Sequence, residues 1–125
     1  MLLAQEVILI VDDDPEVTEG LALALAEPAR LIITCNDVES AQVVLERTTV
    51  RTMVTDVRFS GPFGFEGLDV VRHAIEKAPG IQIILMSGNA TPELESEAFR
   101  RGAQAFLQKP FGLEQLEELL LQEAS

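Results

Sequence analysis

Several apolar segments of this chain end on residue types that can handle a phosphoryl group or a metal ion. In an open parallel α/β sheet, the carboxyl ends of the strands line the crevice where ligands bind. Carboxylates, a hydroxyl and an ammonium group are therefore expected to meet at one edge of a sheet. The segments and the residues that follow them are 7–11 with Asp12 and Asp13, 52–55 with Asp56, 81–86 with Ser87, and 105–108 with Lys109.

The three carboxylates of Asp12, Asp13 and Asp56 would repel one another at close range, so one of them would be driven to take up a proton unless a cation bound. Mg²⁺ prefers oxygen ligands and commonly uses one or two carboxylates together with waters and a phosphate. An aspartate can also act as a nucleophile and become an acyl phosphate. Lys109 would neutralise phosphoryl charge, and the Ser87 hydroxyl would donate a hydrogen bond to a phosphoryl oxygen. The pattern predicts a Mg²⁺-dependent phosphoryl site.

The spacing of the expected strand ends indicates the elements that position these residues. These ends lie at Asp12, Thr34, Asp56, Ser87 and Lys109, so three of the steps are 22 residues long and one is 31. A step of that size holds one strand, one helix and two short loops. Five such units predict an α/β protein with a doubly wound parallel sheet, in the flavodoxin-like (βα)5 strand order 2-1-3-4-5. That order places the first and third strands, and with them the aspartates, side by side.

Capping residues mark where the helices begin. Asp14 and Thr91 are each followed by proline, which combines an N-cap with a proline in the first turn. Asn36, with Glu39 three residues later, resembles a capping box for the second helix. Gly102 stands where the fourth helix is expected to stop.

Composition and charge restrict the class of protein. A chain of 125 residues has the size of one domain, which we assign to residues 1–125, whether it stands alone or is excised from a longer chain. Its net charge of −12 argues against unaided binding to nucleic acid or to anionic membranes. The single cysteine, Cys35, cannot form an internal disulfide, and no apolar stretch approaches the ~20 residues of a membrane helix. We expect a soluble cytoplasmic domain.

Taken together, the strand-end residues resemble the receiver domain of bacterial two-component response regulators, the CheY-like family. The resemblance extends from Val7 to about Gln122. Each short motif is a weak signal alone, whereas all of them at strand ends in one chain are specific. It implies a signalling module and not an enzyme, with phosphate accepted on Asp56 and at most slow self-dephosphorylation. The matching motifs, in this order and spacing, are Val11-Asp12-Asp13, Asp56, Ser87-Gly88 and Lys109-Pro110-Phe111.

The resemblance also implies how Mg²⁺ would be held. Asp13 and Asp56 would ligate the ion directly, together with the backbone carbonyl of Arg58. Asp12 would act through a water molecule.

A conformational switch is a further implication of the resemblance. Ser87 would be the switch hydroxyl, Lys109 would contact the phosphoryl group, and Phe106 would be the switch aromatic that turns inward after phosphorylation. A sensor histidine kinase or a phosphotransfer protein would supply the phosphoryl group. An output domain or a target protein would read the surface formed by the fourth helix, fifth strand and fifth helix. A weak homodimer is a further partner to consider.

The long step after Asp56 enlarges the loop 57–67, where Ser60 occupies a position that is usually proline in the family. This loop is expected either to tune partner choice and phosphoryl lifetime or to act as filler. The main alternative function is a pseudo-receiver that binds partners without phosphorylation. A haloacid-dehalogenase-like phosphatase could use the run 12–14, but Glu16 departs from its motif and Asp56 would be unused. A flavin carrier is disfavoured by the acidic loop.

Overall fold

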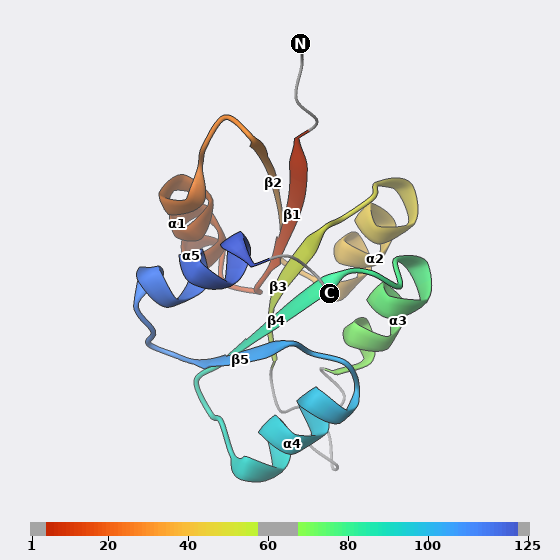
Figure 1. Ribbon diagram of the computed structural model, residues 1–125, viewed down its shortest axis with the longest axis vertical. Helices are drawn as coiled ribbons and strands as arrows, with labels where there is room; N and C mark the ends of the chain where they lie inside the picture. Colours follow the sequence, from red (N-terminus) through yellow and green to blue (C-terminus); the bar gives the residue numbers. More distant parts are fainter. Residues whose placement is uncertain (1–4, 58–67, 123–125) are drawn as a thin grey trace.

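The computed structural model describes residues 5–57 and 68–122, in which strands and helices alternate along the chain (Figure 1). The strands are β1 (Glu6–Val11), β2 (Arg30–Cys35), β3 (Thr52–Asp56), β4 (Gln82–Ser87) and β5 (Ala105–Gln108). The helices are α1 (Pro15–Leu25), α2 (Val38–Arg47), α3 (Asp69–Lys77), α4 (Pro92–Arg100) and α5 (Leu113–Leu121).

The strands form one parallel sheet in the order β2-β1-β3-β4-β5, which confirms the predicted α/β fold. Parallel strands require crossover connections, and α1 to α4 supply them by returning the chain to the amino-terminal side of the sheet. The register places Val11 opposite Thr55 and Ser87 opposite Gln108. The carboxyl ends of β1, β3, β4 and β5 therefore share one edge.

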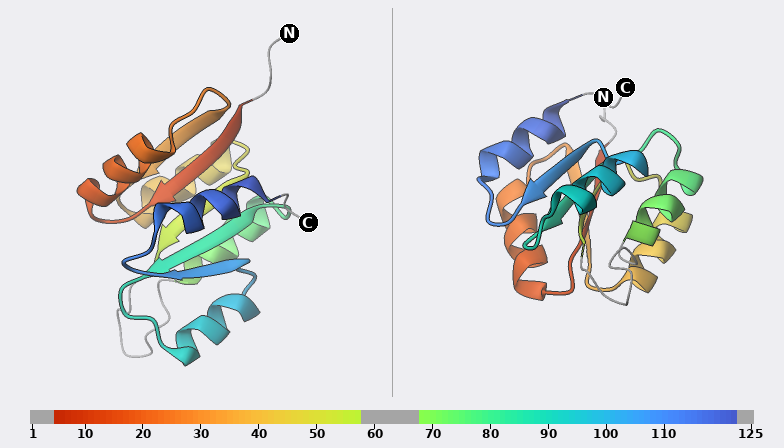
Figure 2. Two further views of the ribbon diagram at one scale, coloured as in Figure 1. Left: turned by 60° about the vertical axis from the view of Figure 1, so that its left-hand side comes forward. Right: turned by 90° about the horizontal axis from the view of Figure 1, so that it is seen from below.

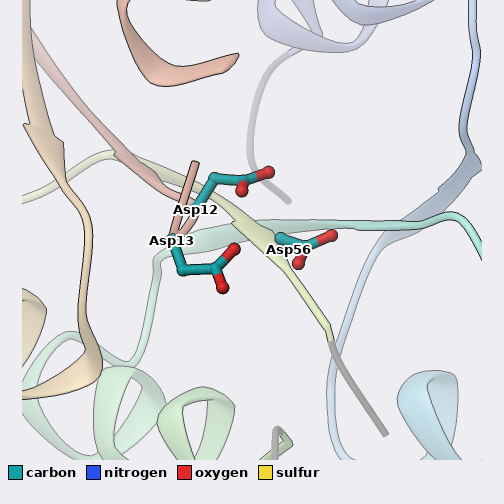
Figure 3. Close-up of side chains that lie close together, drawn as sticks. All are labelled: Asp12, Asp13 and Asp56. Atoms are coloured by element: carbon teal, nitrogen blue, oxygen red, sulfur yellow. The ribbon is translucent and has the colours of Figure 1, made fainter. Parts of the chain in front are cut away.

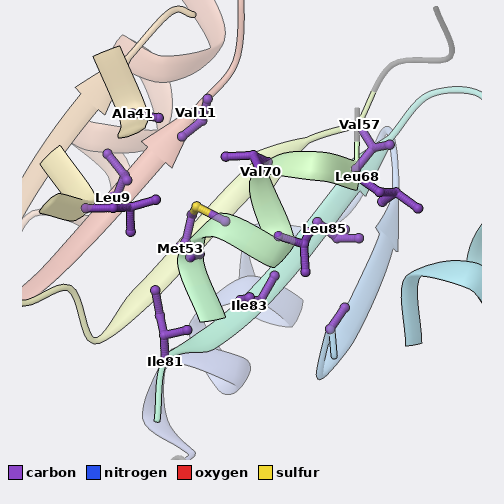
Figure 4. Close-up of a cluster of buried hydrophobic side chains, with 14 of the residues drawn as sticks. Leu9, Val11, Ala41, Met53, Val57, Leu68, Val70, Ile81, Ile83 and Leu85 are labelled. Atoms are coloured by element: carbon purple, nitrogen blue, oxygen red, sulfur yellow. The ribbon is translucent and has the colours of Figure 1, made fainter. Parts of the chain in front are cut away.

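Both faces of the sheet are buried, as expected for parallel strands. Side chains of β1 alternate between the two faces: Leu9 packs into the core beneath α2, α3 and α4, whereas Ile8 and Ile10 pack beneath α1 and α5. Figure 4 shows part of the first core, with Met53 and Ile83 from the central strands. Figure 2 shows the resulting three layers, with the sheet in the middle. Burial of both faces holds the strands, and the residues that follow them, in fixed relative positions.

Three expected helix ends are confirmed, one in α1 and two in α4. Asp14 caps α1 by accepting a hydrogen bond from the backbone N–H of Glu16 at 2.9 Å, and Thr91 caps α4 through the N–H of Leu94 at 3.1 Å. Gly102 follows α4 with a φ of +115°, a left-handed conformation that glycine adopts without strain. These local signals concern backbone groups close in sequence, which is why the sequence indicates them.

The start of α2 differs from the prediction by one residue. Asp37, not Asn36, is the N-cap, because its Oδ1 atom accepts a hydrogen bond from the N–H of Ser40 at 2.6 Å. Both residue types are good caps, so the sequence alone did not distinguish them. The amide of Asn36 is therefore available for contacts outside α2.

Side chains from the sheet bind the carboxyl end of α5. The last carbonyl groups of a helix have no partner within it, and α5 has no basic residue in its last turn. Gln82, at the start of β4, donates to the carbonyl of Leu119 at 2.8 Å. Arg51, just before β3, donates to the carbonyls of Leu120 at 3.3 Å and Gln122 at 3.1 Å. The end of α5 is thus fixed at the amino-terminal side of the sheet.

A bidentate ion pair adds a second attachment for α5. The guanidinium of Arg30, buried at the start of β2, contacts both carboxylate oxygens of Glu117 at 2.9 and 3.1 Å. It also donates to the carbonyl of Leu25 at the end of α1. The hydrogen bond from Arg30 lowers the pKa of Glu117 below its usual value, outweighing the opposite effect of burial. Arg30 therefore joins α1, β2 and α5.

Candidate functional site

Three aspartates lie together at the carboxyl-terminal edge of the sheet (Figure 3). One carboxylate oxygen from each of Asp12, Asp13 and Asp56 lies within 4.8 Å of the others. The pairing of β1 with β3 explains this proximity, because Asp12 and Asp56 follow neighbouring residues of that ladder. Asp12 is buried, Asp56 is partly exposed and Asp13 is exposed, so the cluster is open to solvent on one side.

Lys109 brings a positive charge into this cluster. Its Nζ atom lies 2.7 Å from Oδ2 of Asp12 and 2.8 Å from Oδ1 of Asp56. The backbone N–H of Lys109 donates to the carbonyl of Ser87 at 2.8 Å, which extends the β4–β5 pairing beyond Gln108. Partial burial alone would lower the pKa of the Lys109 ammonium, but its hydrogen bonds to the two carboxylates and their charges raise it above its usual value. Lys109 is therefore a cation at neutral pH.

Ser87 and Phe106 occupy the neighbouring strands. Ser87 is 1% exposed at the end of β4, between the strands that carry Asp56 and Lys109, and its Oγ atom accepts a hydrogen bond from the N–H of Asn89 at 3.1 Å. Phe106 is partly buried in β5 and packs against the core beneath α2, α3 and α4. The peptide bond between Lys109 and Pro110 is cis.

Arg58 and the loop residues 58–67 lie outside the described residues. The predicted carbonyl ligand from Arg58 and the predicted role of the loop 57–67 therefore remain predictions. Among the other predicted site residues, the structure brings Asp12, Asp13, Asp56 and Lys109 into one cluster and places Ser87 on the strand between.

The donor set suits a hard divalent cation. All three acidic residues offer oxygen, the ligand that Mg²⁺ prefers. Within the cluster, Oδ1 of Asp12 already accepts a hydrogen bond from the N–H of Asp14 at 3.0 Å, and its Oδ2 contacts Lys109. Asp13 is the most exposed of the three carboxylates, and Asp56 faces it across the β1–β3 edge.

Sequence reasoning missed two polar residues beside the cluster. The Nδ2 atom of Asn36 donates to the backbone carbonyl of Asp12 at 2.8 Å and to Oγ1 of Thr18 at 3.1 Å. Thr18 is 1% exposed and lies in α1. A usable signal did exist, because Asn36 follows β2 at the same edge where the other site residues follow their strands.

Comparison with known families identifies the architecture. Residues 8–121 match the family model of the response regulator receiver domain. The chain belongs to that family. The match confirms the predicted resemblance over nearly the whole length of this receiver domain. A CheY-like receiver domain from Methanospirillum hungatei shares its fold, with a TM-score of 0.84. That neighbour is 22% identical, and the match covers 94% of this chain and 91% of the other.

Curated relatives of the receiver domain include bacterial response regulators. The C4-dicarboxylate transport transcriptional regulatory protein DctD of Pseudomonas aeruginosa is 29% identical over 86% of this chain, and the match spans 23% of DctD. An uncharacterised 14.6 kDa protein of Leptolyngbya boryana is 32% identical, with 86% of this chain and 82% of the relative covered. A response regulator receiver protein of Pseudomonas putida, solved by crystallography, is 27% identical with a TM-score of 0.81, covering 95% and 98% of the two chains. The chain thus spans less than a quarter of DctD.

Within residues 5–57 and 68–122, no helix has the length and apolar character needed to cross a bilayer.

Proposed function

We propose that this receiver domain accepts a phosphoryl group on Asp56 in a Mg²⁺-dependent reaction. The observation that carries the proposal is the contact of the Lys109 ammonium with Asp56 and Asp12, in a cluster of three carboxylates at the carboxyl edge of the sheet. Such a cluster combines a nucleophilic oxygen, ligands for a hard cation and a fixed positive charge. An ion pair of Lys109 with Asp12 and Asp56 would not by itself need the Asp13 carboxylate within 4.8 Å of the other two.

The cation would be held by Asp13 and Asp56 directly, with the carbonyl of Arg58 as the third protein ligand. Asp12 would act through water, since both of its oxygens already have partners within the protein. When bound, Mg²⁺ would offset negative charge on the carboxylates and on the incoming phosphoryl oxygens. The proximity of the three aspartates supports their part in this proposed ligand set. The Arg58 carbonyl is included because the chain belongs to the receiver family.

In the proposed reaction, a carboxylate oxygen of Asp56 attacks the phosphorus of a phosphohistidine in the donor protein. The new bond joins phosphorus to the Asp56 oxygen, and the phosphorus–nitrogen bond breaks with its electron pair returning to the imidazole nitrogen. Lys109 would pair with a phosphoryl oxygen, since its ammonium already lies 2.8 Å from Asp56. The product is an acyl phosphate on Asp56.

The phosphorylated state would be read through Ser87 and Phe106. The Ser87 hydroxyl would move to a phosphoryl oxygen, and Phe106 would turn further inward, changing the surface of α4, β5 and α5. A sensor histidine kinase or phosphotransfer protein would be the donor. DctD extends far beyond the matched region. By analogy with such longer relatives, an output domain or a target protein would receive the signal from this receiver domain. A phosphatase of the haloacid-dehalogenase type is not favoured, because it leaves unused an Asp56 that contacts Lys109.

Intact mass spectrometry after incubation with Mg²⁺ and acetyl phosphate tests the proposal. Wild type should gain the mass of one phosphoryl group, whereas Asp56→Asn, and wild type in excess EDTA, should not. Asp69→Asn, which changes an exposed aspartate on α3, is the matched control and should behave as wild type. Absence of the adduct on wild type with acetyl phosphate and with candidate kinases would instead support a phosphorylation-independent pseudo-receiver.

A further inference from the structure

The side chain of Asn36 holds the peptide group that joins two of the acidic residues. Its Nδ2 atom donates to the backbone carbonyl of Asp12, and this carbonyl belongs to the peptide between Asp12 and Asp13. The N–H of Asp12 donates to the carbonyl of Cys35 at 3.1 Å. Residues 35 and 36 therefore fix the backbone of Asp12 from both sides, although they lie on a different strand and the loop that follows it.

The same amide group connects Asp12 with α1. Asn36 also donates to Oγ1 of the buried Thr18, and that hydroxyl donates to the carbonyl of Pro15 at 3.2 Å. The connection runs from the peptide after Asp12, through Asn36 and Thr18, to the first turn of α1. It spans the whole acidic segment 12–14, which is the part of the chain that must supply a metal ligand.

We infer that Asn36 is a positioning residue for the Mg²⁺ site, acting through the Asp12–Asp13 peptide and supported by Thr18. This inference rests on the proposed function. Rotation of that peptide would move the Asp13 carboxylate relative to Asp56, because the nitrogen of the peptide belongs to Asp13 and carries its Cα atom. Residues that orient metal ligands from outside the ligand set typically change metal affinity by about 10–100-fold when replaced.

A titration of backbone amide NMR signals with Mg²⁺ tests the inference in the unphosphorylated protein. Asn36→Leu removes both donated hydrogen bonds with little change in side-chain size and without adding charge. We expect its Mg²⁺ dissociation constant to rise about tenfold relative to wild type. Asn36→Gln retains an amide donor and should recover part of the lost affinity, which an effect of side-chain packing alone would not produce.

The matched control separates site geometry from stability. Asp37→Ala removes the N-cap of α2 and is expected to lower the thermal midpoint of unfolding in EDTA. Because the Asp37 side chain accepts from the N–H of Ser40 within α2, this substitution should leave the Mg²⁺ affinity unchanged. Weaker Mg²⁺ binding in Asn36→Leu but not in Asp37→Ala supports the inference. If wild type binds Mg²⁺ and Asn36→Leu binds it equally well, the positioning role is overturned while the proposed function stands. If wild type itself shows no saturable binding, the proposed function fails, and the positioning role fails with it.

Discussion

The ammonium nitrogen of Lys109 lies 2.8 Å from Asp56, although β4 separates the two strands that lead to them. The lysine spans this distance because its backbone continues the β4–β5 pairing to the edge of the sheet, where Ser87 ends the strand between. With Asp12 and Asp13, the cluster holds three carboxylates and one ammonium, a formal charge of −2. A single divalent cation would cancel that charge.

Removal of the ammonium should therefore strengthen cation binding. In Lys109→Met, the positive charge that competes with Mg²⁺ for Asp12 and Asp56 is absent, and we expect the dissociation constant of Mg²⁺ to fall by about 3- to 10-fold. Isothermal titration calorimetry at low salt measures this change, since salt screens the effect. The same variant should be phosphorylated less readily, because the phosphoryl oxygens lose their cationic partner.

Lys77→Met provides the control for net charge. Lys77 lies exposed in the last turn of α3, so its replacement removes one positive charge far from the acidic cluster. Its Mg²⁺ affinity should match wild type. Equal affinities for Lys109→Met and wild type would mean that the ammonium does not compete with the cation.

The Arg30–Glu117 pair should make stability depend on pH in the acid range. Arg30 lowers the pKa of Glu117, so the pair stabilises the fold above the usual glutamate value of 4.5 and loses this contribution as pH falls through the lowered pKa. We expect Glu117→Gln to lower the free energy of unfolding by about 1 kcal/mol at neutral pH. Urea unfolding followed by far-UV circular dichroism, at about pH 7 and about pH 3.5, should show this difference shrinking at the lower pH.

Glu118→Gln removes a carboxylate from the exposed side of the same helix and serves as control. Its effect on unfolding should be small at both pH values, as for most surface substitutions. A constant difference between Glu117→Gln and wild type across the pH range would contradict the assignment to the ion pair.

Two glycine substitutions should have opposite effects on stability. Gly102→Ala places a Cβ atom about 2.5 Å from Cδ1 of Ile75 at a φ of +115°, and should cost about 1–3 kcal/mol of unfolding free energy. Gly20 lies inside α1, and apart from its chain neighbours and the adjacent backbone of the same helix no heavy atom lies within 4 Å of an added Cβ. Gly20→Ala should therefore stabilise the domain by about 0.5–1 kcal/mol. Chemical denaturation measures both, and a stabilised Gly102→Ala would refute the structural explanation.

Movement of Phe106 can be followed with an introduced fluorophore. The chain contains no tryptophan or tyrosine, so Phe106→Trp supplies one emitting side chain. Because Phe106 is only partly buried, an inward turn on phosphorylation should shift the emission to shorter wavelength when Mg²⁺ and acetyl phosphate are added. Phe99→Trp, at an exposed position on α4, reports changes that do not involve the switch residue. An unchanged spectrum in a protein shown by mass to be phosphorylated would remove Phe106 from the proposed switch.

The sequence predicted the sheet order and the acidic cluster because both depend on regular strand spacing and on residue types at strand ends. It misplaced the α2 cap by one residue, since Asn36 and Asp37 are equally suited to capping and only the fold decides between them. The position of Asn36 directly after β2 indicates the edge of the sheet at which it lies. Its contacts with Asp12 and Thr18 cross 24 and 18 positions of the chain, so no local pattern indicates these two partners.

The attachment of α5 was also not predicted, for a related reason. Arg51 and Gln82 bind the carbonyl end of α5 from the starts of other strands, and neither belongs to a recognisable motif. Their partners are backbone carbonyls, which every residue carries. Only the packed structure therefore shows which arginine and which glutamine serve this purpose.

These attachments anchor the carboxyl end of α5 more firmly than its amino end. Arg51 and Gln82 hold its carboxyl end, whereas its amino end follows the Lys109–Pro110 turn beside the acidic cluster. Sliding of the helix along its axis would break these hydrogen bonds and the ion pair of Arg30 with Glu117 together. A tilt of the amino end would disturb the contacts at Leu119 and Leu120 least and would have to stretch the Arg30–Glu117 pair. A displacement that begins at Lys109 would therefore be largest near Leu113 and would fade toward Leu120.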